Sequence, residues 1–191
     1  LSIAADSKYW LWVNGEIQVR EGGLKRGPNP NDTYCDVIRS LPALRRGKNT
    51  IAVLVWYFGK DGFSHRNSPT PGMTFALQVN GRPIVPRRDW RVKKHPAFYL
   101  PQGPNPNYRL PESNVGFDAA RDIPFTEASF NDRSWDKARK VSLDCAGWNR
   151  LVERPIPLWR DFGLKSYMHT EMKNDTTLVA YLPYNAQVMP Y

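Results

Sequence analysis

The sequence has 191 residues and a formal net charge of +9, and 41% of its residues are hydrophobic and 13% aromatic. This composition supplies enough large apolar side chains for a packed core and excludes wholesale disorder, and no apolar run approaches the ~20 residues that a membrane-spanning helix needs. The 17 prolines and 13 glycines would interrupt long helices repeatedly, so the composition predicts an all-β, loop-rich protein.

The first predicted element is a β-hairpin in which residues 9–13 pair with residues 16–20. The two runs meet at Asn14 and Gly15, and Asn-Gly adopts the positive φ angles of a type I′ turn. Alternation places large apolar side chains on both faces of the first strand, with Tyr9, Leu11 and Val13 on one face and Trp10 and Trp12 on the other. Two covered faces are typical of a β-sandwich.

Further short strands are predicted along the chain. Residues 49–59 are continuously apolar in their middle and are predicted to form the central strand of a sheet. A second hairpin is predicted to turn at Asn80 and Gly81. Other strands are expected in residues 33–38, 89–94, 114–122 and 177–191, and a helical turn capped by Asp132 is expected in residues 130–141. Short strands separated by turns favour a sandwich.

The predicted organisation has three parts. We expect a jelly-roll β-sandwich over residues 1–95, a proline-rich linker over residues 96–111 that holds no strand ladder, and a small β-rich segment over residues 112–191. Residues 147–159 are interpreted as an interdomain strap rather than a pocket.

Several sequence stretches resemble known families. ADSKYWLWVNGE and GKNTIAVLVWYFG resemble the Y-x-L-x-V-N-G and G-x-N-x-I-A-V signature of galactose-binding-like jelly rolls. FDAARD, FNDRSWDKA and GWNRLVERPIPLWRDFG look like the non-catalytic region that precedes the catalytic barrel of family 78 α-L-rhamnosidases, especially those of Bacteroides-type gut bacteria. Both ends of the sequence fall inside elements of that region, so we expect a piece of a longer protein.

The resemblance also implies a function. In that family the inverting carboxylates lie in a large downstream (α/α)₆ barrel, so none of them is carried over to this sequence. The chain is therefore expected to be a non-catalytic module of a glycoside hydrolase that supports the barrel, with a periplasmic or extracellular location and no cofactor. Asp118, Asp122 and Glu127 are catalytic candidates by residue type only, because loop spacing does not fix the distance between two carboxylates.

A carbohydrate site needs an aromatic face beside polar groups. Trp56 and Tyr57 end an apolar strand and lead into a loop with Asp61, His65 and Arg66, so these five residues are the predicted rhamnose-glycan ligands. The alternative is that Trp56 belongs to the core and that the loop packs against a neighbouring domain.

Other classes of site find less support. The basic stretch from Arg82 to Lys94 raises the alternative of a polyanion-binding module, but no nucleic-acid motif accompanies it. The sequence has no His, Cys or Asp residues at a spacing typical of a metal site, although Asn29, Asn31 and Asp32 could supply oxygen ligands from a loop. Cys35 and Cys145 are compatible with one disulfide or with two buried thiols.

Overall fold

The structure is a computed structural model that describes residues 1–23, 32–62, 65–84, 90–103, 112–142, 147–160, 162–163 and 165–185. Within these ranges the regular elements are β-strands and one 3₁₀ turn, η1 (Ala119–Arg121), which confirms the predicted all-β class. No helix of this part is long and apolar enough to cross a membrane. The chain divides into two compact units, Leu1–Trp159 and Arg160–Tyr191. The boundaries predicted near residues 95 and 111 stay a prediction.

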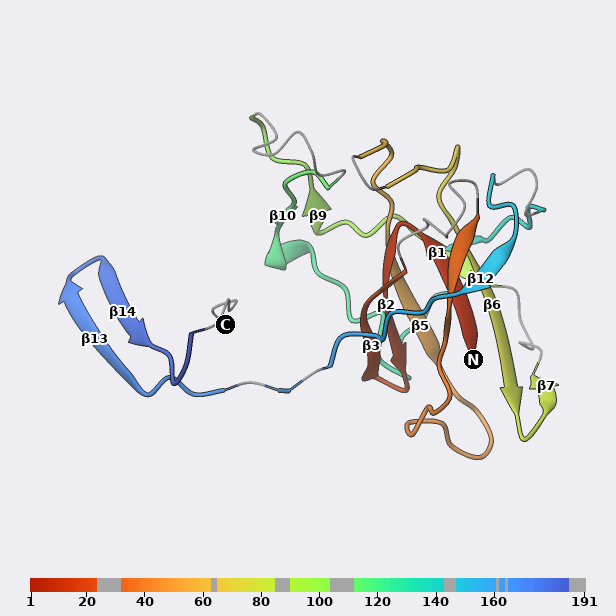
Figure 1. The fold of residues 1–191 in the computed structure, drawn as a ribbon, viewed down its shortest axis with the longest axis horizontal. Helices are drawn as coiled ribbons and strands as arrows, with labels where there is room; N and C mark the ends of the chain where they lie inside the picture. The colour runs from red at the N-terminus through yellow and green to blue at the C-terminus, as the bar shows by residue number, and fades with distance from the viewer. Residues whose placement is uncertain are drawn as a thin grey trace. The chain divides into compact units, whose positions relative to one another are not determined.

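The larger unit contains a five-stranded sheet (Figure 1). Its strands, in spatial order, are β12 (Leu151–Glu153), β4 (Thr33–Val37), β1 (Ser2–Asp6), β6 (Gly72–Val79) and β7 (Arg82–Ile84). β1 pairs antiparallel with both β4 and β6, whereas β12 pairs parallel with β4. The predicted turn between β6 and β7 is confirmed, because Asn80 and Gly81 have φ angles of +50° and +75°.

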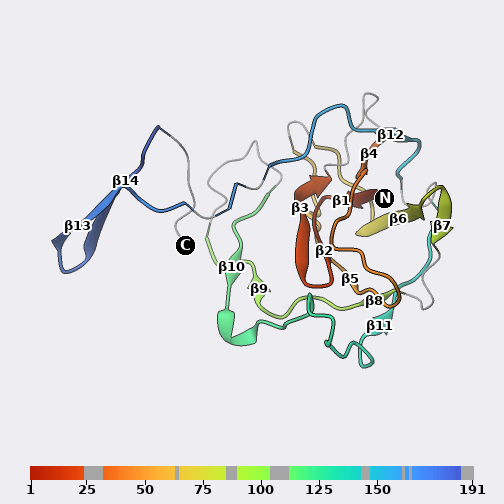
Figure 2. The ribbon, with the colours of Figure 1, turned by 90° about the horizontal axis from the view of Figure 1, so that it is seen from below.

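A three-stranded sheet lies against the first sheet (Figure 2), which confirms the sandwich. Its order is β3 (Glu16–Gly23), β2 (Lys8–Val13) and β5 (Ile51–Trp56). The first predicted hairpin is confirmed, with φ angles of +52° at Asn14 and +86° at Gly15. The prediction that β5 is central is wrong, because β2 is the middle strand. Continuous apolarity arises in β5 because both of its faces are half-buried, not because it has two strand neighbours.

The core lies between the two sheets and follows the period of two that the sequence showed. Tyr9, Leu11 and Val13 of β2, which were predicted to share one face, are fully buried, and Tyr9 and Leu11 pack in one cluster with Ile3 and Ala5 of β1. The other face of β2 is covered differently, since the Trp12 ring meets Phe125 edge-on at 5.6 Å between centroids. Both faces of β2 are therefore occupied.

Three short ladders lie outside the sandwich sheets. β8 (Arg91–Val92) pairs with β11 (Asp136–Lys137), β9 (Phe98–Tyr99) pairs with β10 (Gly116–Phe117), and β13 (His169–Asn174) pairs with β14 (Thr177–Tyr181). β9 corrects the expectation that residues 96–111 hold no ladder, because its two residues fall between the prolines. The helical turn expected after Asp132 is a simple turn that ends in β11, with the Trp135 amide donating to the Asp132 carbonyl.

Candidate functional site

The loop after β5 carries four of the five residues predicted as glycan ligands, and most of its polar side chains hydrogen-bond within the protein. The Tyr57 hydroxyl donates to the Ser68 carbonyl at 2.7 Å and accepts from Asn67 Nδ2 at 2.9 Å. Asp61 Oδ1 accepts from the Asn67 amide at 2.7 Å. These hydrogen bonds join residues within the loop, so Tyr57 and Asp61 stabilise its conformation.

His65 is brought to a buried polar cluster at the end of β1. Its side chain is 3% exposed, and its Nε2 lies 3.4 Å from Ser7 Oγ and 3.8 Å from Asp6 Oδ1. Asp6 Oδ2 accepts the Ser68 amide at 2.7 Å. Serine and aspartate thus face the same ring nitrogen, whereas a nucleophilic triad needs them on opposite nitrogens. The cluster joins the loop to β1 and is closed to solvent.

Trp56 is the last residue of β5, and its carbonyl accepts a hydrogen bond from the Ser7 backbone amide at 3.0 Å. Its half-buried ring meets Phe58 edge-on at 5.2 Å, and Lys8 Nζ lies 5.9 Å from its centroid. Lys8 is held there by Glu112 at 3.2 Å. Arg66 is exposed. The structure therefore gathers Tyr57, Asp61 and His65 through intramolecular bonds, and ligand binding by the five residues stays a prediction.

The three catalytic candidates each have a local partner of their own. Asp118 caps η1 by accepting the Ala120 amide and pairs with Arg121 at 3.3 Å. Asp122 Oδ1 lies 3.4 Å from Nε2 of His95, and Glu127 accepts from the Ser129 hydroxyl. Burial lowers the pKa of His95, and the Asp122 carboxylate opposes that shift.

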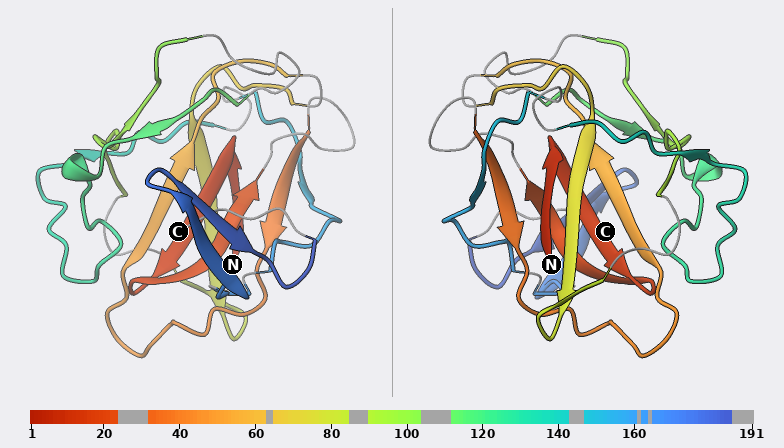
Figure 3. Two further views of the ribbon diagram at one scale, coloured as in Figure 1. Left: turned by 90° about the vertical axis from the view of Figure 1, so that its left-hand side faces the viewer. Right: turned by 90° about the vertical axis from the view of Figure 1, so that its right-hand side faces the viewer.

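The strap, residues 147–159, runs beside β4, and its strand β12 pairs with the outer edge of β4 (Figure 3). At one end of β4, the Thr33 hydroxyl donates to the Trp148 carbonyl at 2.9 Å, and Arg150 Nη2 lies 3.2 Å from Asp32 Oδ2. Between the two ends, β12 extends the sheet. The strap thus packs within its own unit, with Trp148 buried against Ala4 and Cys35.

A buried ion pair lies at the other end of β4. Arg154 Nε lies 2.6 Å from Asp36 Oδ1, and the two side chains are 10% and 3% exposed. Asp36 Oδ2 also accepts from the Tyr9 hydroxyl at 2.7 Å and from the Gly23 amide at 2.8 Å. Burial, with the Asp36 charge adding to it, raises the pKa of Tyr9. One carboxylate therefore links three strands to the strap.

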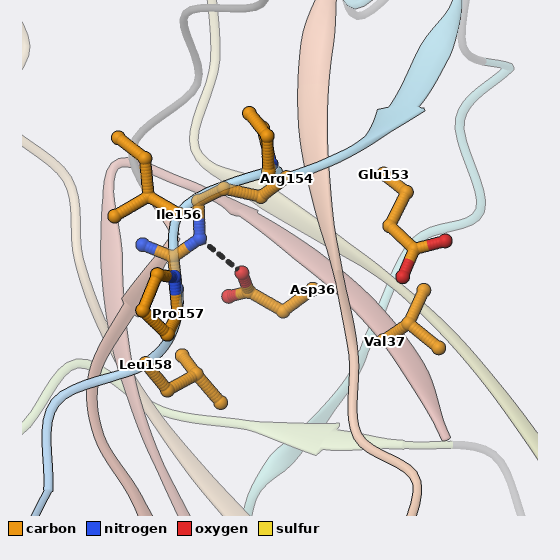
Figure 4. Close-up of a pocket in the computed structure, with 8 residues that line it drawn as sticks. Asp36, Val37, Glu153, Arg154, Ile156, Pro157 and Leu158 are labelled. Atoms are coloured by element: carbon orange, nitrogen blue, oxygen red, sulfur yellow. Dashed lines mark ion pairs between the residues drawn. The ribbon is translucent and has the colours of Figure 1, made fainter.

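A small pocket of ≈ 220 Å³ opens beside this pair (Figure 4). It is lined by Asp36, Val37, Glu153, Arg154, Pro155, Ile156, Pro157 and Leu158. Its two carboxylates are already engaged, because Asp36 has three partners and Glu153 pairs with Arg39 at 3.1 Å on the surface. Both carboxylates of the pocket therefore have structural partners within the chain.

Sequence reasoning missed Asp36 and Arg154, although a usable signal was present. Asp36 is the charged residue of a predicted strand, and a carboxylate that becomes buried there requires a charged or hydrogen-bonding partner. Which of the 27 basic residues supplies it depends on the path of the strap, and a period-two pattern does not contain that information.

The remaining predicted sites gain little support. Among the described residues no group of three His, Cys, Asp or Glu side chains could hold a metal ion. Asn29, Asn31 and Cys145 lie outside the described residues, as do Arg87 and Arg88 of the basic stretch. Cys35 is a free, buried thiol. Arg91 of the basic stretch donates to the Trp135 carbonyl, which leaves it a structural role.

Comparison with known proteins gives one informative likeness. No family model and no curated protein matches the sequence. The structure is similar to the crystal structure of the GH78 family rhamnosidase of Bacillus sp. GL1, with a TM-score of 0.66 and 28% sequence identity over 82% of this chain. The match spans 16% of the length of that rhamnosidase chain. The chain is thus related to part of a glycoside hydrolase.

Proposed function

We propose that the chain is a non-catalytic β-sandwich module of an α-L-rhamnosidase-like glycoside hydrolase, and that it supports a catalytic domain. The observation that carries the proposal is the likeness to 16% of a GH78 rhamnosidase, at 28% identity across most of this chain. The periplasmic or extracellular location is part of the proposal and rests on the sequence resemblance alone.

The contacts of the candidate residues favour a structural, non-catalytic role for the module. Asp36 and Arg154 form an ion pair inside the larger unit, and polar groups of the loop after β5 hydrogen-bond to one another. Glycoside hydrolysis needs one carboxyl group kept protonated and a second one facing it across the sugar. The catalytic candidates instead cap a turn or pair with a neighbouring side chain.

The proposed supporting role is tested by a domain exchange in the Bacillus sp. GL1 rhamnosidase. The region of that enzyme matched by this chain is exchanged for this chain, and hydrolysis of an aryl α-L-rhamnoside is measured beside a variant that lacks the region. We expect the exchanged enzyme to be soluble and active, and the deletion variant to be insoluble or inactive.

The 191-residue chain is assayed alone in parallel. We expect it to leave the rhamnoside intact. Hydrolysis by the chain alone, abolished by one Asp or Glu substitution, would contradict the proposal, as would a deletion variant that retains full activity.

A further inference from the structure

Tyr99 lies flat on a glycine in the ladder of β9 and β10. The two residues are direct cross-strand partners, with Tyr99 opposite Gly116. A Cβ atom placed on Gly116 would lie 2.3 Å from Cζ of Tyr99 and under 3 Å from two further ring atoms. The ring therefore occupies the space that a side chain at position 116 would fill, and the glycine backbone supports one of its faces.

More than half of Tyr99 is exposed to solvent. Tyr99 is 55% exposed although one side of its ring rests on Gly116, so the exposed surface belongs mainly to the opposite side. Cross-strand partners share a face and successive residues alternate. The next pair, Phe98 and Phe117, therefore points the other way, where their rings lie 5.0 Å apart.

The opposite face of the ladder is the one that anchors it. Phe98 lies 5.0 Å from the His95 ring, and His95 in turn lies 5.5 Å from Phe125, which contacts Trp12 of the sandwich. Tyr99 takes no part in that chain of aromatic contacts. Its ring is fixed in orientation by Gly116, as when an aromatic side chain covers a glycine in a sheet, and more than half of the residue stays exposed to solvent.

Other aromatic groups of the larger unit are less suited to hold a ligand. Trp12, Trp56, Trp90 and Trp135 each meet a phenylalanine ring edge-on, and Trp148 is buried. Among the described residues of this unit, Tyr99 and Trp159 are the aromatic side chains more than half exposed, and Trp159 belongs to no strand. Tyr99 thus combines exposure with a fixed ring plane.

We propose that Tyr99 is a stacking platform for one pyranose ring of a rhamnose-containing glycan. A flat aromatic face is complementary to the C–H face of a sugar, and a 6-deoxy sugar adds a methyl group to that apolar surface. The choice of a sugar rests on the proposed function, because the relationship to a rhamnosidase supplies the ligand class. The site differs from the loop after β5.

The proposal is tested by isothermal titration of the 191-residue chain with rhamnose, methyl α-L-rhamnoside and rhamnose oligosaccharides. Tyr99→Ala should weaken binding at least about tenfold, and Tyr99→Phe should retain it because stacking needs the ring rather than the hydroxyl. Gly116→Ala should weaken binding with the tyrosine still present, since its methyl group lifts the ring. Tyr184→Ala, which removes a 65% exposed tyrosine, is the matched control.

The other outcomes contradict the proposal that Tyr99 is a stacking platform. Saccharide binding that survives Tyr99→Ala places the site elsewhere, and a folded chain without saccharide affinity has no such site. If no sugar binds and Tyr99→Ala instead inactivates the exchanged Bacillus enzyme, the surface is a contact between domains. The supporting role is judged separately by the activity of that exchanged enzyme, so the two proposals fail independently.

Discussion

Arg154 Nε lies 2.6 Å from Asp36 Oδ1, and this pair joins the strap to the sandwich. The same carboxylate accepts hydrogen bonds from Tyr9 of β2 and from Gly23 of β3. A charge this deeply buried is stable only when it is paired and hydrogen-bonded. Three strands and the strap therefore depend on one aspartate.

Replacing Arg154 with alanine should lower the free energy of unfolding by about 3–5 kcal/mol, because it leaves the Asp36 charge buried without its cation. Urea denaturation followed by tryptophan fluorescence measures the change. Arg39→Ala is the matched control, since Arg39 is 79% exposed in its pair with Glu153. That surface pair should contribute less than about 1 kcal/mol. Equal losses in the two variants would contradict the anchoring role of Arg154.

Replacing Tyr9 with phenylalanine should cost about 1.5–3 kcal/mol near neutral pH, because the hydroxyl donates to a charged group. This advantage of the wild-type chain should shrink with alkali. The raised pKa of Tyr9 means that the unfolded chain loses the proton first as the pH rises above about 10. Deprotonation then favours the unfolded state by up to about 1.4 kcal/mol per pH unit.

The measurement is the difference in urea unfolding free energy between wild type and Tyr9→Phe at pH 8, 10 and 11. Taking the difference between the two chains cancels the other tyrosines and the lysines. A difference that stays constant across this range would show that the Tyr9 hydroxyl is not held neutral by the fold.

Substituting Gly22 with alanine should destabilise the chain by about 1–3 kcal/mol through overpacking. The new Cβ would lie 2.3 Å from Cζ of Tyr9, whose ring is fully buried and tied by its hydroxyl to Asp36. Gly72→Ala is the control within a strand, because its Cβ would lie 3.8 Å from Trp148, an ordinary contact distance. Thermal unfolding compares them, and equal midpoints would refute the clash.

Replacing Asp122 with asparagine should lower the pKa of His95 further, because the carboxylate opposes the effect of burial. An NMR titration of the imidazole resonances measures the shift, with Asp118→Asn as a control. Since the fold favours neutral His95, its contribution to stability is present above pH 6.5 and is lost as the pH falls through the lowered pKa. A rise in the His95 pKa in the variant would be inconsistent with this arrangement.

The local sequence pattern was enough to predict those features that depend on only a few neighbouring residues. Alternation placed Tyr9, Leu11 and Val13 on one face, which the structure buries, and Asn-Gly pairs located both confirmed turns. Period-two burial and positive φ angles are properties of neighbouring residues, so a single sequence displays them. The Asp118 cap and its pair with Arg121 are local in the same sense, because the groups lie within three residues of one another.

Tertiary structure decided every feature that depends on which strand lies beside which. β5 is an edge strand rather than a central one, and β12 joins β4 across more than a hundred residues. The partners Asp36 and Arg154, and the support of Tyr99 by Gly116, follow from sheet order and register. Hydrophobic burial drives collapse without direction, so the pairing of distant groups is settled only when the strands are packed together.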